Sequence, residues 1–187
     1  MTQVTVFSTS FRDNSLNTRL ALCVQKTLQS ISEVEVNYLS LKNFNIPLYE
    51  GDLEEKSGIP ADVKSLSEQI VKTQALVICS PEYNGSISAP LKNILDWVSR
   101  VRPNPWQGKS VFLLSASPGA LGGLRGLWHA RVPFAALGCH VYPEMVAVGK
   151  AHEALSADSQ ILDEKLKSLI EKNLSQFIHF SKSLENI

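Results

Sequence analysis

The sequence carries no excess of charge of either sign, with 18 Lys and Arg and 18 Asp and Glu among its 187 residues. A neutral chain has no net field that would draw it onto nucleic acid or an anionic membrane surface. Its apolar runs are also far shorter than the roughly 20 residues that a membrane-spanning helix needs. We therefore expect no nucleic-acid partner and no membrane partner, and any anion must be bound by a local group of residues.

Cysteine is scarce as well. Cys23, Cys79 and Cys139 are far apart and form no C-x-x-C pair, which argues against metal ligands or redox centres. Cys23 and Cys79 lie among apolar residues, so we predict that both are buried thiols. The stretch M-T-Q-V-T-V-F-S enters a strand-like run without the basic and apolar regions of a signal peptide. We expect a reduced, cytoplasmic protein.

Several common nucleotide-binding and catalytic motifs are missing. The G-K-S at Gly108–Ser110 lacks the earlier glycine of a P-loop, where Pro103 stands, and no strand is followed by G-x-G-x-x-G. The four histidines have no metal-site spacing, so we expect no metal. The segment S-A-S-P-G resembles a hydrolase nucleophile elbow. However, Pro118 lacks the backbone N–H that the oxyanion hole requires there.

What the sequence does contain is a regular alternation of strand-like and helix-like segments. Apolar runs of strand length lie at Val4–Ser8, Val34–Leu39, Ala75–Ser80, Val111–Ser115 and Val141–Val148. Segments with a helical period lie at Ser15–Ser30, Val63–Val71, Leu91–Val98, Leu124–Leu137 and Leu162–Phe177, with a kink or boundary expected at Pro133. This alternation predicts a single α/β domain over residues 1–187, with a parallel sheet and helices on both faces.

One connection does not fit the alternation. Phe44–Gly58 is long and non-periodic, and such a connection is usually functional or covered by a partner.

Ligands of an open parallel sheet bind beyond the carboxyl ends of its strands, so the segments that follow the strands are informative. The first strand is followed by S-T-S-F-R-D-N-S-L-N-T, which leads directly into a helix. A helix N-terminus presents free N–H groups and partial positive charge, which suit a phosphate, and Arg12 adds a cation. Further donors in this loop are Ser10, Ser15, Asn17 and Thr18. The alternative is that Ser15 or Asn14 only caps the helix.

The third strand is followed by P-E-Y-N-G, Pro81–Gly85, and then by a helix start marked by Ser88 and Pro90. Such a loop offers consecutive backbone N–H groups, which can bind the edge of a planar heterocycle while the ring of Tyr83 borders it. A plain strand-to-helix connection is the alternative. The fourth strand is followed by Ser115–Gly126, where four glycines in eight residues allow close approach of the backbone to a ligand.

Together these three segments resemble the NADPH-dependent FMN reductase family, which includes flavodoxin-like quinone, azo-dye and chromate reductases. The signature P-E-Y-N-G-S-I-x-x-x-L-K-N-x-x-D-W is the specific part, and the resemblance covers roughly Val4 to Val148. It implies a flavodoxin-like, doubly wound sheet of five parallel strands in the order 2-1-3-4-5. The family's phosphate loop, G-S-x-R-x-x-S-x-N, falls on residues 9–17, with Thr9 in place of the leading glycine.

The resemblance also implies the site and the cofactors. The expected FMN-binding residues are Ser10, Arg12, Ser15, Leu16, Asn17, Pro81, Glu82, Tyr83, Asn84, Gly85, Ser117 and Gly119. FMN would carry the hydride and electron chemistry from NADPH or NADH to a quinone-like acceptor, so no catalytic side chain is expected. A homodimer or homotetramer is implied. The candidates for the subunit boundary are Phe44–Gly58, Trp97, Arg100, Trp106 and Glu144.

Two other functions fit the same fold. A flavodoxin-like electron carrier would bind FMN without reacting with NADPH, although such carriers are typically acidic and this chain is neutral. An interaction protein that has lost its ligand would bind no flavin. The sequence leaves open the acceptor, the preferred nicotinamide nucleotide, dimer against tetramer, and how tightly FMN is retained.

Overall fold

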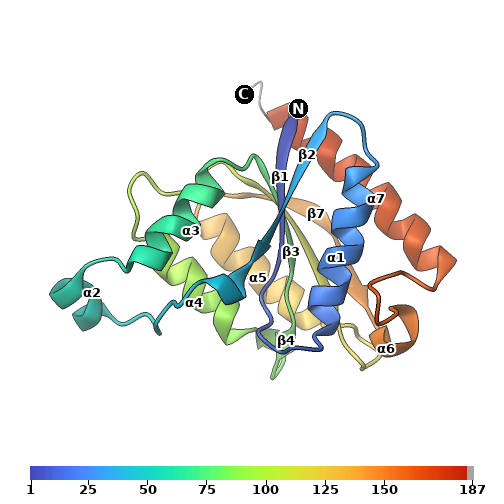
Figure 1. Ribbon diagram of the computed structural model, residues 1–187, viewed down its shortest axis with the longest axis horizontal. Helices are drawn as coiled ribbons and strands as arrows, with labels where there is room; N and C mark the ends of the chain where they lie inside the picture. Colours follow the sequence, from blue (N-terminus) through green and yellow to red (C-terminus); the bar gives the residue numbers. More distant parts are fainter. Residues whose placement is uncertain (185–187) are drawn as a thin grey trace.

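The computed structural model describes residues 1–184, and its centre is a five-stranded parallel sheet (Figure 1). The strands are β1 (Thr2–Ser8), β2 (Val34–Ser40), β3 (Ala75–Cys79), β6 (Ser110–Ala116) and β7 (His140–Val148). They lie in the order β2-β1-β3-β6-β7. Counted along the chain as the first to fifth strands of this sheet, they have the order 2-1-3-4-5. The expected flavodoxin-like sheet is confirmed.

The composition of each strand matches its place in the sheet. Central β3 and its neighbour β6 are buried along their whole length, which explains their continuous apolar sequence. Edge strand β2 instead carries exposed residues at alternate positions. The other edge strand, β7, contains Pro143, and the pairing of β6 with β7 shifts register between Val111 and Leu113. Proline is tolerated there because it needs no ladder hydrogen bond at an edge irregularity.

Helices cover both faces of the sheet (Figure 1). Helices α1 (Leu16–Gln29) and α7 (Glu164–Leu184) pack on one face, and α3 (Ala61–Val71), α4 (Ala89–Val98) and α5 (Leu124–Ala136) pack on the other. Helix α5 continues through Pro133 to Ala136, so of the kink or boundary expected there the boundary is wrong. No helix within residues 1–184 has the combination of length and apolar character that is needed to cross a membrane.

Serine caps fix two helix starts at the carboxyl edge of the sheet. Ser15 Oγ accepts a hydrogen bond from the Thr18 N–H at the start of α1. Ser88 Oγ accepts one from the Leu91 N–H at the start of α4, with Pro90 in the first turn. Ser15, and not Asn14, therefore caps α1, and the phosphate site at this helix start stays a prediction.

The segment after β3 is a hairpin and not the open loop that we expected. Strands β4 (Glu82–Tyr83) and β5 (Ser86–Ile87) pair antiparallel across Asn84 and Gly85. These two turn residues have φ of 50° and 77°, the positive values that a two-residue hairpin turn requires. Pairing uses some of the backbone groups that an open loop would leave free. The strands are too short to show an alternating pattern.

The long Phe44–Gly58 connection also contains structure. It includes helix α2 (Gly51–Ser57), which has no buried residue and projects away from the sheet (Figure 1). A helix whose one core contact is the partly buried Leu53 needs no apolar stripe, which is why its sequence is non-periodic. Two further short elements are the 3₁₀ helix η1 (Leu41–Asn43) and α6 (Ala151–Ala154).

Candidate functional site

Three segments that are distant in sequence meet in one cleft of about 220 Å³ at the carboxyl edge of the sheet. They follow β1, β3 and β6, as expected for this topology. The cleft is lined by Ser10, Arg12, Asn14, Ser15, Leu16, Asn17, Pro81, Glu82, Tyr83, Ala116, Ser117 and Pro118. All predicted binding residues line it except Asn84, Gly85 and Gly119, which lie outside the lining.

The side formed by the start of α1 is suited to an anion. Its first turn has no acidic residue. Arg12 is exposed and makes no ion pair within residues 1–184. Ser15 Oγ accepts the Thr18 N–H at 3.2 Å, which leaves its own O–H free to donate. The neighbouring acid, Asp13, forms an ion pair with Lys42. The hydrogen bond from Lys42, at 2.6 Å, lowers the pKa of the Asp13 carboxyl.

Asn17 connects the start of α1 to the end of β6. Its Nδ2 donates to the Ala116 carbonyl and its Oδ1 accepts the Ala116 N–H, both at 2.9 Å. The side chain is buried, and these two bonds satisfy backbone groups that would otherwise lack partners. Asn17 therefore holds two walls of the cleft together, whatever it adds to ligand binding.

Thr9 explains how the phosphate loop tolerates the loss of the family's glycine. Its side chain is fully buried, and Thr9 is not among the residues that line the cleft. Thr9 Oγ1 lies 2.9 Å from Ser80 Oγ and 3.1 Å from Ser88 Oγ. These hydroxyls join the ends of β1 and β3 to the cap of α4, so Thr9 fixes the frame beneath the site.

The hairpin wall is attached to the start of α5 through Glu82. Its carboxylate accepts hydrogen bonds from Arg125 Nε at 2.8 Å and from the Gly126 N–H at 3.2 Å. Burial by itself would raise the pKa of Glu82, but the bonds from Arg125 and Gly126 outweigh it and lower the pKa. Glu82 is therefore an ionised carboxylate, and its oxygens are bonded to Arg125 and Gly126 at the start of α5.

The third wall is held by the end of β7. The Ser117 N–H donates to the Val148 carbonyl at 3.0 Å, and the Lys150 N–H donates to the Gly119 carbonyl at 3.2 Å. Ser117 Oγ accepts the Gly119 N–H at 3.2 Å. Gly119 itself is exposed, and a Cβ added there would make only an ordinary contact, 3.7 Å from Ser117 Oγ.

The glycines of this wall serve packing inside the chain. A Cβ on Gly122 would lie 2.6 Å from the backbone of Ala147, and one on Gly123 would lie 2.1 Å from Ser115 Oγ. Both glycines also have positive φ. The four-glycine pattern that suggested close approach to a ligand is therefore explained, at these two positions, by close approach of the chain to itself.

Sequence reasoning missed three lining residues and one supporting residue. Asn14, Ala116 and Pro118 line the cleft, and each is adjacent to a predicted residue, so widening each motif by one position would have found them. Arg125 lies in a different element from its partner Glu82. No local signal in the sequence joins the two.

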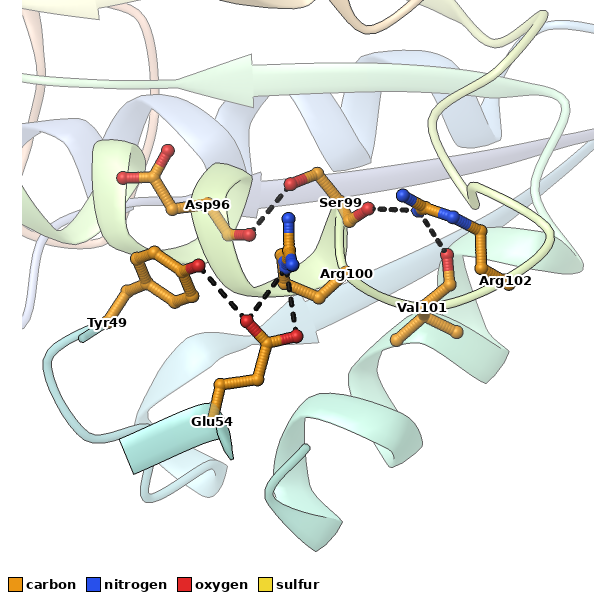
Figure 2. Close-up of polar contacts among 7 residues, drawn as sticks. All are labelled: Tyr49, Glu54, Asp96, Ser99, Arg100, Val101 and Arg102. Carbon is orange, nitrogen blue, oxygen red and sulfur yellow. Dashed lines mark hydrogen bonds and ion pairs between the residues drawn. The ribbon is translucent and has the colours of Figure 1, made fainter. Parts of the chain in front are cut away.

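The expectation that Trp97 and Trp106 lie at a subunit boundary is wrong, and Arg100, a third candidate, makes an intramolecular contact. Trp97 and Trp106 are fully buried within the single chain, so neither can form a subunit surface. Arg100 lies at the end of α4, where its Nε donates to both carboxylate oxygens of Glu54 at 2.9 Å. Tyr49 Oη donates to the same carboxylate at 3.1 Å (Figure 2). This cluster holds α2 and lies apart from the cleft lining.

Comparison with known proteins decides the family. The sequence profile of the NADPH-dependent FMN reductase family matches residues 2–153. The chain belongs to this family. The quinone reductase of Escherichia coli K12 is 38% identical over 130 residues, which cover 69% of this chain and 67% of the relative. The NADPH:quinone oxidoreductase of Arabidopsis thaliana is 30% identical over 187 residues, which cover 98% of this chain and 93% of the relative.

A solved structure is similar to this chain over nearly the full length of both proteins. FerB, a flavoenzyme NAD(P)H:(acceptor) oxidoreductase from Paracoccus denitrificans, has a TM-score of 0.82 to this chain at 26% identity, and the match covers 98% of each. The family and fold expected from the three motifs are thus confirmed. So is the class of activity, an FMN- and NAD(P)H-dependent oxidoreductase. The FMN contacts of individual residues stay predictions.

Proposed function

We propose that this reductase binds FMN in the cleft, with the phosphate at the start of α1 and the flavin ring edge between the hairpin and residues 116–118. The observation that carries the proposal is the convergence of three distant segments on one cleft. Each segment supplies one part of what FMN requires: a phosphate site, an aromatic border and a close backbone wall.

The chemistry of the donor set fits a phosphate. The unpaired Arg12, the free O–H of Ser15 and an α1 first turn without acidic residues all favour an anion at this end. The hairpin neutralises its own carboxylate through Arg125, so Glu82 does not oppose the negative charge of the ligand.

The other end fits a flat ring. Pro81, Tyr83, Ala116 and Pro118 present flat or small surfaces to the cleft. Its volume of about 220 Å³ is below the roughly 300–1,000 Å³ of typical ligand pockets. A ligand of the size of FMN would therefore protrude, which leaves part of the ring accessible to a second substrate.

When bound, FMN supplies the hydride chemistry between NAD(P)H and an electron acceptor. The residues of the chain bind and orient it, and we assign no catalytic residue. Glu82 is the one carboxylate among the cleft-lining residues described, and it is committed to Arg125. Quinone-like acceptors are proposed because the relatives in E. coli and Arabidopsis are named as quinone reductases.

We further propose a cytoplasmic location and a homodimer or homotetramer. All three cysteines are buried free thiols, as is usual in a reducing compartment. Helix α5 exposes two large apolar side chains one turn apart, Trp128 and Val132. Exposed apolar groups that lie together favour a protein contact.

The test is the visible absorption spectrum of the purified protein with added FMN, before and after anaerobic NADPH. We expect retained flavin bands that bleach with NADPH alone, because the ring is open to the hydride donor. Retained bands that do not bleach would indicate the electron carrier. No retained flavin would overturn the assignment of the cleft.

A further inference from the structure

We propose that Glu82 and Arg125 are positioning residues of the flavin site, which dock the β4–β5 hairpin on the start of α5 and so fix the Tyr83 side chain at the cleft. This inference rests on the proposed function, because it assigns a role toward FMN. It concerns residues that do not need to touch the ligand through their charged groups.

The ion pair has the geometry of a specific attachment. Two nitrogens of Arg125 reach Glu82 Oε1, Nε at 2.8 Å and Nη2 at 2.5 Å, while the Gly126 N–H donates to Oε2 at 3.2 Å. Both carboxylate oxygens are thus engaged by the first turn of α5. A second link joins the same two elements, since His129 Nδ1 lies 3.0 Å from Ser86 Oγ.

Because Glu82 is the more buried residue of the pair, its position depends on Arg125 more than that of Arg125 depends on it. The Glu82 side chain is only 10% exposed, whereas that of Arg125 is 56% exposed. A carboxylate that is largely removed from water needs its donors, because an unpaired buried charge is costly. Removal of Arg125 would therefore displace Glu82, and with it the adjoining Tyr83.

Close backbone packing supports the docking of the hairpin on α5. A Cβ on Gly126 would lie 3.0 Å from the Ser86 carbonyl oxygen and 3.1 Å from Glu82 Cα. The helix backbone therefore lies directly against both strands of the hairpin. A two-stranded hairpin is marginally stable by itself, and strands of two residues cannot hold a position without such docking.

The consequence for function follows from the position of Glu82 in the chain. Its neighbours Pro81 and Tyr83 line the cleft on either side of it. When the hairpin is docked, these residues are placed for the ligand before it arrives. If the docked state is only partly populated, the apparent affinity for FMN equals the affinity of the docked state multiplied by the populated fraction.

The experiment compares Arg125→Ala with Arg100→Ala in the full chain. Arg100 makes the matched ion pair with Glu54, with a similar exposure of 44%, away from the cleft (Figure 2). Four quantities are measured for each variant: the FMN dissociation constant, the visible circular dichroism of bound FMN, the melting temperature without FMN, and the mass by light scattering.

We expect Arg125→Ala to weaken FMN binding about tenfold, the effect of one lost charge-assisted hydrogen bond, and to change the circular dichroism of bound FMN. Arg100→Ala should change neither. Mass should equal that of the parent in both. Arg125→Lys restores the charge without the fork and should recover part of the affinity, and Glu82→Gln should match Arg125→Ala.

The outcomes separate the two proposals. If the parent protein binds no FMN, the proposed function fails and the inference with it. If the parent binds FMN but Arg125→Ala and Glu82→Gln bind it with the affinity and spectrum of Arg100→Ala, only the positioning role fails. Should Arg125→Ala fail to fold, the Arg125→Lys and Glu82→Gln pair decides by the same two readouts.

Discussion

At the scale of single residues, the loop after β1 divides its work between ligand and frame. Thr9 and Asn17 are buried and bonded to other strands, whereas Arg12 is exposed on the cleft without an ionic partner within residues 1–184. A long cation that is left unpaired at a helix start is available to an anion and contributes little to the fold.

Substitution of Arg12 tests this division. We expect Arg12→Ala to weaken FMN binding by about 1.5 to 3 kcal/mol, the strength of hydrogen bonds to a charged group, with an unchanged melting temperature of the flavin-free protein. Fluorescence titration with FMN measures the first effect. Arg19→Ala is the control, since it removes the same charge from α1 outside the cleft lining. Equal affinity of the two variants would place the phosphate elsewhere.

The sequence predicted which residues line the cleft better than it predicted what each of them does there. The motifs selected most of the cleft lining because short polar residues at strand ends are visible in the sequence. They did not reveal that Ser15 both caps α1 and keeps a free donor, or that Asn17 bonds to Ala116. The role of Asn17 depends on a contact between α1 and β6, whose bonded residues are 99 positions apart in the sequence.

At the scale of elements, α2 has no buried residue and is attached to α4 largely by polar contacts. The preceding segment is fastened where Trp97 Nε1 and Asn93 Nδ2 both donate to the Pro47 carbonyl. The helix itself is fastened by Glu54 with Arg100 and Tyr49 (Figure 2). Only this second attachment contains an acid.

The attachment of α2 should therefore weaken in acid. The hydrogen bond from Arg100 lowers the pKa of Glu54 below its ordinary 4.5. The stabilisation is complete above about pH 4.5 and is lost as pH falls through the lower pKa of the folded state. We expect amide exchange of residues 51–57, corrected for its intrinsic pH dependence, to rise in that range.

Arg100→Ala provides the reference for this effect. It should show the faster exchange already at neutral pH and no additional rise in acid. Lys92→Ala, which breaks the neighbouring pair with Asp96 on α4, should behave as the parent. A parent and an Arg100→Ala variant with the same exchange at neutral pH would show that Glu54 does not hold the helix.

Elements with their own core were predictable, and elements without one were not. Strands β3 and β6 have continuous apolar sequences because they are buried on both faces, and helices α1 and α4 have periodic ones because one side of each packs against a core. The β4–β5 hairpin and α2 bury too little to leave such a pattern. Their positions depend on ion pairs and a few partly buried apolar contacts between distant segments, which a single sequence does not display.

At the scale of the whole molecule, the sheet separates two hydrophobic cores. Helix α5 packs into the core that also holds α3 and α4. Its inner side packs Leu127, Ala130 and Phe134, all fully buried. Its outer side exposes Trp128 by 54% and Val132 by 71%. A helix with apolar residues on both sides is better explained by a second protein surface than by solvent.

A subunit contact through this outer side makes a prediction about mass. Light scattering of the parent should give a dimer or tetramer. Trp128→Lys should raise the dissociation constant of the oligomer roughly 30-fold, since a tryptophan buried at a subunit contact contributes at least about 2 kcal/mol to the free energy of association. Leu169→Lys is the matched control, because Leu169 is an exposed apolar residue on α7, across the sheet. A monomeric parent would contradict the oligomer itself. Equal masses for both variants at every concentration would instead move the contact away from α5, toward the projecting Phe44–Gly58 segment.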